Sequence, residues 1–74
     1  MTVRKFLEMQ YKQSGMTLEI LVKKNDESYQ TVVDCNIFYW ESIKDDILNL
    51  LVTKFAFESK GSLVRTSIWC EEDR

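Results

Sequence analysis

The chain of 74 residues contains no histidine and no proline, and only two glycines and two cysteines. Without histidine it lacks the commonest general base and the commonest metal ligand of proteins. Cysteines at positions 35 and 70 do not have the spacing of a zinc site, and two isolated glycines cannot build a phosphate-binding loop. We therefore expect a protein that is not an enzyme and that holds no metal and no cofactor.

An excess of positive charge is also missing. Ten lysines and arginines are scattered along the chain against twelve acidic residues, which gives a net charge of −2. Nucleic-acid binding usually relies on a basic excess that neutralises phosphates. Direct binding of DNA or RNA is thus disfavoured.

Long apolar runs are absent as well. No segment approaches the ~20 apolar residues of a membrane span, and the first residues, MTVRKFLEMQYKQ, lack the apolar core of a signal peptide. We expect a cytoplasmic protein without a membrane partner. In that compartment Cys35 and Cys70 are expected to be reduced thiols, with a disulfide between them as the alternative.

What is present indicates one small globular domain over residues 1–74. Hydrophobic residues make up 45% and charged residues 30% of the chain, which argues against disorder. A chain of this length buries a small core. Aromatic residues reach 12%, so we expect some of them at the surface.

The first half predicts a helix followed by two strands. Thr2 can cap a helix that runs to about Gln13, with its apolar stripe on Val3, Phe6, Leu7 and Tyr11 and a stop at Ser14-Gly15. From residue 17 the apolar period changes to two, which predicts strands over 17–23 and 29–35 joined by a polar turn over 24–28.

The second half predicts a helix and a hairpin. Ser42 with Asp45 is a near-match to a capping box, and Asp45 and Asp46 lie in the first turn that negative charge favours. The runs VTKFAFE and LVRTSIW flank SKGS. With Lys60-Gly61 as a two-residue loop, Phe57 would lie opposite Val64.

These elements define an α+β fold. The predicted order is α-β-β-α-β-β, in one mini-domain whose antiparallel sheet carries two short helices.

The run CNIFYW, residues 35–40, lies between the predicted second strand and second helix. As an extended segment it would direct Ile37 and Tyr39 to one side and Phe38 and Trp40 to the other. One pair should belong to the core. The other pair is then available to a partner, with Tyr39 or Trp40 presenting a polar tip.

Five residues are the candidates for a partner-binding surface: Tyr39, Trp40, Asp45, Asp46 and Trp69. Tryptophan and tyrosine often dominate interface energies. Each candidate has a structural alternative, because Trp69 can pack under a helix and the two aspartates can simply stabilise a helix start. The acidic stretches 41–46 and 71–73 can be solvated surface or can imitate nucleic-acid phosphates in a basic groove of a partner.

The opening MTVRKFLEM and the ending VTKFAFESKGSLVRTSIW resemble small uncharacterised proteins of bacterial phages and other mobile elements. The resemblance covers both ends of the chain and transfers no site residue. It implies a small protein that binds and blocks a host protein, such as a CRISPR nuclease or another defence nuclease.

The leading expectation is therefore a stoichiometric inhibitor or adaptor of a host protein. A structural homo-oligomer, in which residues 35–40 or the edge of the last hairpin bind a second copy, is the alternative. A minimal nucleic-acid-binding module is the third hypothesis.

Overall fold

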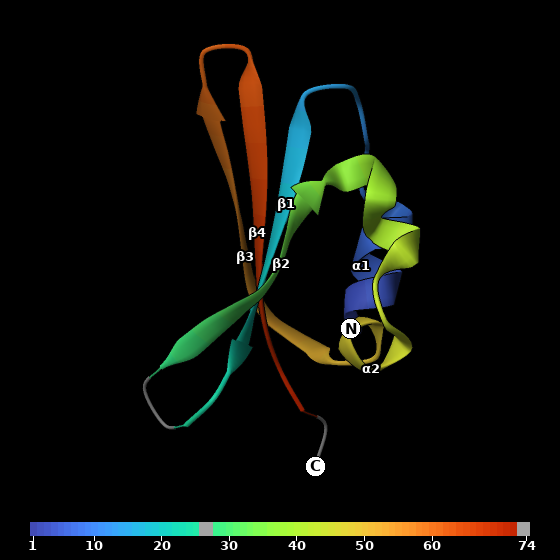
Figure 1. Ribbon diagram of the computed structural model, residues 1–74, viewed down its shortest axis with the longest axis vertical. Helices are drawn as coiled ribbons and strands as arrows, with labels where there is room; N and C mark the ends of the chain where they lie inside the picture. Colours follow the sequence, from blue (N-terminus) through green and yellow to red (C-terminus); the bar gives the residue numbers. More distant parts are fainter. Residues whose placement is uncertain (26–27, 73–74) are drawn as a thin grey trace.

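The structure is a computed structural model that describes residues 1–25 and 28–72. It is a small α+β domain with a four-stranded sheet on which the helical segments pack on one side (Figure 1). In chain order the elements are α1 (Val3–Met9), β1 (Met16–Lys23), β2 (Tyr29–Asn36), the 3-10 helix η1 (Ile37–Ser42), α2 (Asp45–Leu48), β3 (Leu51–Lys60) and β4 (Leu63–Glu71).

The sheet is mixed, so the prediction of a purely antiparallel sheet is wrong. Its strand order is β2-β1-β4-β3, and the two central strands β1 and β4 run parallel, while β1–β2 and β3–β4 are antiparallel hairpins. The local pattern predicts each hairpin but not which of their strands meet. The strands that meet are β1 and β4, which carry fully buried apolar side chains: Leu18 and Ile20 on β1 and Ile68 on β4.

Helix α1 is shorter than predicted. The Thr2 side chain caps it by accepting a hydrogen bond from the Lys5 amide at 3.2 Å, as expected. It ends at Met9 instead of Gln13, because the backbone of Gln10 is extended and its side chain bonds to β4. Tyr11, predicted to join the buried stripe, is consequently exposed.

The segment after β2 is a 3-10 helix and not an extended strand. Three residues per turn place residues i and i+3 on one side. Ile37 is fully buried and Trp40 packs against the core, while Phe38 and Tyr39 are exposed. The predicted inward and outward pairs are therefore wrong, although one half of the aromatic run does belong to the core.

Helix α2 has a single turn and starts later than predicted. Ser42 ends η1 and caps nothing, and the N-cap of α2 is Lys44, which makes no side-chain capping bond. The placement of Asp45 and Asp46 in the first turn is confirmed. Two successive short helices replace the one longer helix that the sequence indicated.

The last hairpin has the predicted faces with a shifted register. Its loop is Gly61-Ser62, with Gly61 at a φ of 64°, and Phe57 lies opposite Thr66 instead of Val64. Because the shift is two residues along β4, residues 54–60 keep their expected faces. A bulge between Val52 and Lys54 turns Val52 to the core side, opposite Cys70, so its predicted pairing with Trp69 on the other face is wrong. Phe55 and Phe57 share the helix side of β3.

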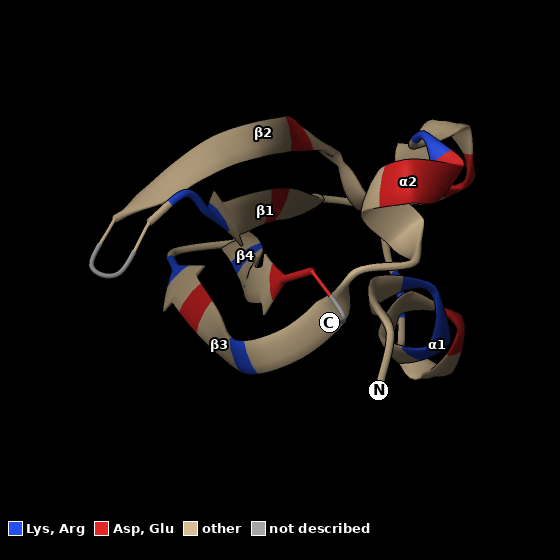
Figure 2. Cartoon of the chain, turned by 90° about the horizontal axis from the view of Figure 1, so that it is seen from below, with Lys and Arg blue, Asp and Glu red and all other residues tan. Residues whose placement is uncertain are grey.

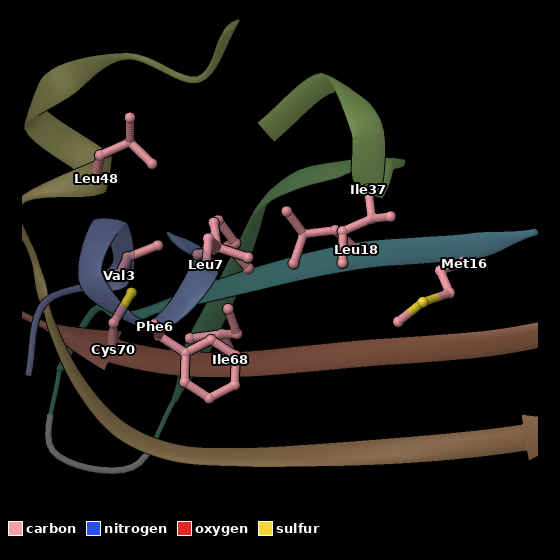
Figure 3. Packing of buried hydrophobic residues seen from close by; sticks show 10 residues of the cluster. Val3, Phe6, Leu7, Met16, Leu18, Ile37, Leu48, Ile68 and Cys70 are labelled. Atoms are coloured by element: carbon pink, nitrogen blue, oxygen red, sulfur yellow. The ribbon is translucent and has the colours of Figure 1, made fainter. Parts of the chain in front are cut away.

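The core lies between the helices and one face of the sheet. Figure 3 shows side chains from α1, η1 and α2 directed towards those of β1 and β4. The buried apolar cluster consists of Val3, Phe6, Leu7, Met16, Leu18, Ile20, Ile37, Leu48, Ile68 and Cys70. The helices thus cover the middle of the sheet, and the opposite face carries charged side chains together with Trp69.

One polar pair interrupts this core and gives a first test. Thr66, fully buried on β4, accepts a hydrogen bond of 2.8 Å from the side-chain amide of Gln10. Thr66→Val should lower the free energy of unfolding by about 1–3 kcal/mol, because the buried amide loses its partner. Adding Gln10→Leu should recover most of the loss. Chemical denaturation of the three proteins checks this, and equal stability of the single and double variants would contradict it.

Two predicted features fall partly outside the described residues. They are the turn over 24–28, which includes residues 26 and 27, and the acidic tail over 71–73, which includes residue 73. Across residues 1–25 and 28–72, no helix has both the length and the apolar character to cross a membrane.

Candidate functional site

The η1–α2 segment presents aromatic and acidic side chains together. Phe38 is 53% and Tyr39 65% exposed, side by side on η1. Glu41 follows on η1, and Asp45 and Asp46 occupy the first turn of α2, all three exposed. Figure 2 shows the acidic colour on α2. We call Phe38, Tyr39, Glu41, Asp45 and Asp46 the η1–α2 surface.

The two aspartates differ in their contacts. The Asp45 carboxylate forms an ion pair of 2.8 Å with the Arg4 guanidinium of α1, which ties α2 to α1 at the surface. The Asp46 carboxylate accepts a hydrogen bond from the adjacent Ile47 amide at 3.0 Å. Neither aspartate approaches the other as a catalytic pair would, because neighbours on a helix point ~100° apart.

Trp40 lies on the inner side of this segment. Its ring packs against the core, and the Lys12 ammonium lies 5.3 Å from the ring centroid on the outside. A ring held in this way positions η1, so Phe38 and Tyr39 are the aromatic side chains that a partner would meet.

Trp69 lies on the other face of the sheet. It is half-buried on β4, and the Lys54 ammonium is 4.3 Å from its ring centroid. Thr53 donates a hydrogen bond of 3.1 Å to the Trp69 carbonyl. The alternative in which Trp69 packs under a helix is therefore wrong. The five sequence-predicted residues do not form one surface, because Trp69 is separated from Tyr39, Asp45 and Asp46 by the sheet.

The face around Trp69 is held by ion pairs. The Arg65 guanidinium lies 3.6 Å from Glu19 and 3.3 Å from Asp34, which are opposite each other on β1 and β2. The interaction with Glu19, and after it the interaction with Asp34, raises the pKa of Arg65. Lys23 and Glu71 form a further pair at 3.8 Å. Because these charged side chains pair with one another, this face of the sheet is best interpreted as solvent-facing surface and not as a binding site.

The two thiols are poorly suited to nucleophilic chemistry. Burial raises the pKa of Cys70 to about 11, and burial together with the charge of Asp34 raises the pKa of Cys35. Cys35 lies opposite Leu18 of β1 and Cys70 opposite Val22, so they are about 13 Å apart along the sheet. A disulfide needs Cα atoms within ~7 Å, so the fold keeps both thiols free.

An apolar groove between α1 and β3 was not predicted. It has a volume of about 480 Å³ and is lined mostly by apolar side chains, among them Phe6, Met9, Tyr11, Phe55 and Phe57. The alternating sequence FAF of residues 55–57 places two phenylalanines on one face of β3, but it does not show whether a helix covers them. Because α1 ends at Met9, it covers only part of the helix side of β3. Phe6 packs against Phe55 with ring centroids 4.9 Å apart, yet Phe55 and Phe57 remain 52% and 54% exposed.

Comparison with known protein families, with curated proteins and with solved structures found no match to this chain. In the part of the chain that the structure describes, no group of three or more Cys, Asp or Glu side chains is arranged to hold a metal ion. The functional interpretation therefore rests on the surfaces themselves.

Proposed function

We propose that this protein is a non-catalytic binding protein that acts by stoichiometric contact with another protein through the η1–α2 surface. The observation that carries the proposal is the adjacency of two exposed aromatic side chains, Phe38 and Tyr39, with three exposed carboxylates. Aromatic side chains supply much of the energy of interfaces, and charged residues around them set the partner and the rate of association.

The chemistry of this surface favours a partner with a basic patch around an apolar pocket. The resemblance to phage proteins makes a bacterial defence nuclease the first target to test, with the protein acting as an inhibitor or adaptor in the bacterial cytoplasm. Nucleases carry basic grooves for nucleic acid, and carboxylates beside aromatic anchors can occupy such a groove.

The test compares three tagged proteins in capture from bacterial lysate. The double variant Phe38→Ala, Tyr39→Ala removes the anchors, and Tyr29→Ala removes an exposed aromatic of β2 as the matched control. We expect one protein to be recovered in a 1:1 complex by the native chain and by the control, with at least ~100-fold weaker binding to the double variant.

The purified pair then tests the acidic part of the surface. Asp46→Lys should slow association and reduce its dependence on salt, since exposed charges act mainly on the association rate. Equal binding by the native chain and the double variant would contradict the proposal, as would recovery of no protein from lysates of several bacteria.

A further inference from the structure

The outer edge of β3 is an open strand with a defined length. The order β2-β1-β4-β3 makes β3 an edge strand. The first residues of the chain cover its start. Thr2 forms an antiparallel β-bridge with Leu51, and the Val52 amide donates a hydrogen bond of 2.8 Å to the Met1 carbonyl. Beyond this bridge, no strand among residues 1–25 and 28–72 pairs with the outer side of β3. Residues 54–60 therefore offer unpaired backbone groups, and no bulge interrupts them.

The two faces of this open segment differ in chemistry. The helix side carries Phe55 and Phe57, whose ring centroids are 5.6 Å apart, beside the apolar groove. The other side carries Lys54, Ala56 and Glu58, which lie opposite Trp69, Ser67 and Arg65 of β4. Figure 2 shows the basic and acidic bands that follow each other along β3.

This pattern is complementary to itself when the strand is reversed. We propose that β3 pairs antiparallel with β3 of a second copy about a two-fold axis at Ala56, so that Lys54 lies opposite Glu58 of the other copy. Phe55 then lies opposite Phe57 of the other copy on the helix side, and the smallest side chain of the segment is at the axis. Two-fold contacts of this kind use the same patch on both subunits.

Charge selects this register over its neighbours. An axis at Lys54 or at Glu58 would place identical charges opposite each other, and an axis at Phe57 would place Lys54 opposite Lys60. An axis at Phe55 would leave Lys54 opposite Ala56, with no ion pair. Like charges directly opposite destabilise an antiparallel pair, whereas opposite charges and aromatic pairs stabilise it.

The pairing also accounts for exposed groups that the single chain leaves without partners. Glu58 makes no ion pair in the described part of the chain, because Arg65 opposite it binds Glu19 and Asp34. The Lys54 ammonium is held on this face by the Trp69 ring, where the Glu58 carboxylate of the second copy would arrive. On the helix side, the two copies of Phe55 and Phe57 would close the apolar grooves against each other.

Sedimentation equilibrium of the full chain tests the proposal with two charge reversals. Lys54→Glu makes positions 54 and 58 both acidic, and Glu58→Lys makes both basic. Each variant alone should dissociate about tenfold more readily than the native dimer, since two pairs of like charges then face each other. An equimolar mixture of the two variants should form a mixed dimer, and the double reversal should restore self-association.

The control is Lys60→Glu, a reversal on the same strand outside the two proposed ion pairs, which should leave the dimer intact. Circular dichroism establishes that each variant is folded. A native chain that stays monomeric at millimolar concentration would overturn the proposal. So would a dimer that both single reversals leave unchanged, because its interface would then be elsewhere.

Discussion

Replacing Ile37 with alanine should lower the free energy of unfolding by about 2–5 kcal/mol, whereas Phe38→Ala should change it by less than ~1 kcal/mol. Ile37 has no exposed surface, and in Figure 3 its side chain is directed towards Leu18 of β1. Phe38 is the larger side chain, but more than half of it is exposed. Small domains have only ~5–15 kcal/mol of stability in total, so the first variant should lose a large fraction of that free energy.

Urea denaturation followed by circular dichroism measures the difference, and the next two residues supply a second comparison. Trp40→Ala should cost more than Tyr39→Ala, because the 3-10 helix places Trp40 with Ile37 on the inner side. In an extended segment Tyr39 would share the side of Ile37, and the order would be reversed. A large loss for Phe38→Ala or Tyr39→Ala would therefore refute the helical assignment of η1.

The stability of the protein should fall as the pH rises above about 9, because of Cys70. Burial raises the pKa of this thiol from 9.0 to about 11, and the thiol donates a hydrogen bond of 3.4 Å to the Leu21 carbonyl. Above pH 9 the unfolded chain loses the proton while the folded chain retains it. The contribution is thus fully present below pH 9 and is lost as the pH rises through about 11. The pKa difference corresponds to ~3 kcal/mol.

Urea denaturation between about pH 8 and about pH 11 measures this slope in three proteins. Cys70→Val, which keeps the side chain apolar and close in volume, should remove most of the slope. Cys35→Ala should retain it, because Cys35 is only half-buried. An unchanged slope in Cys70→Val would assign the alkaline loss of stability to other groups.

The local features of the sequence predicted the elements better than their assembly. The Thr2 cap, both hairpins and the faces of residues 54–60 follow from patterns within a few residues, and the structure contains them. The parallel pairing of β1 with β4 depends on which strands bury most apolar surface together, and no local pattern contains that choice. The end of α1 likewise coincides with a distant contact, the hydrogen bond between Gln10 and Thr66, which no local pattern indicates.

The candidate site was predicted in part. Tyr39, Asp45 and Asp46 are exposed on neighbouring segments, as their residue types indicated, while Trp40 is turned inward and Trp69 lies across the sheet. A run of four apolar residues fits a strand and a 3-10 helix equally well, so it does not determine which side chains face outward. The groove beside Phe55 and Phe57 exists because α1 ends at Met9. The apolar stripe through Tyr11 predicted a longer helix, so the sequence did not indicate the groove.

The parallel pair at the centre of the sheet has a consequence for synthesis. Met16 of β1 lies opposite Val64 of β4. During synthesis β1 is made first, and it can pair with its second neighbour only after β4 has been made. A hairpin of two strands alone is marginal in water, and contacts between distant parts of a chain form slowly. We therefore expect a nascent chain that lacks β4 to remain unfolded until residues 63–71 have left the ribosome.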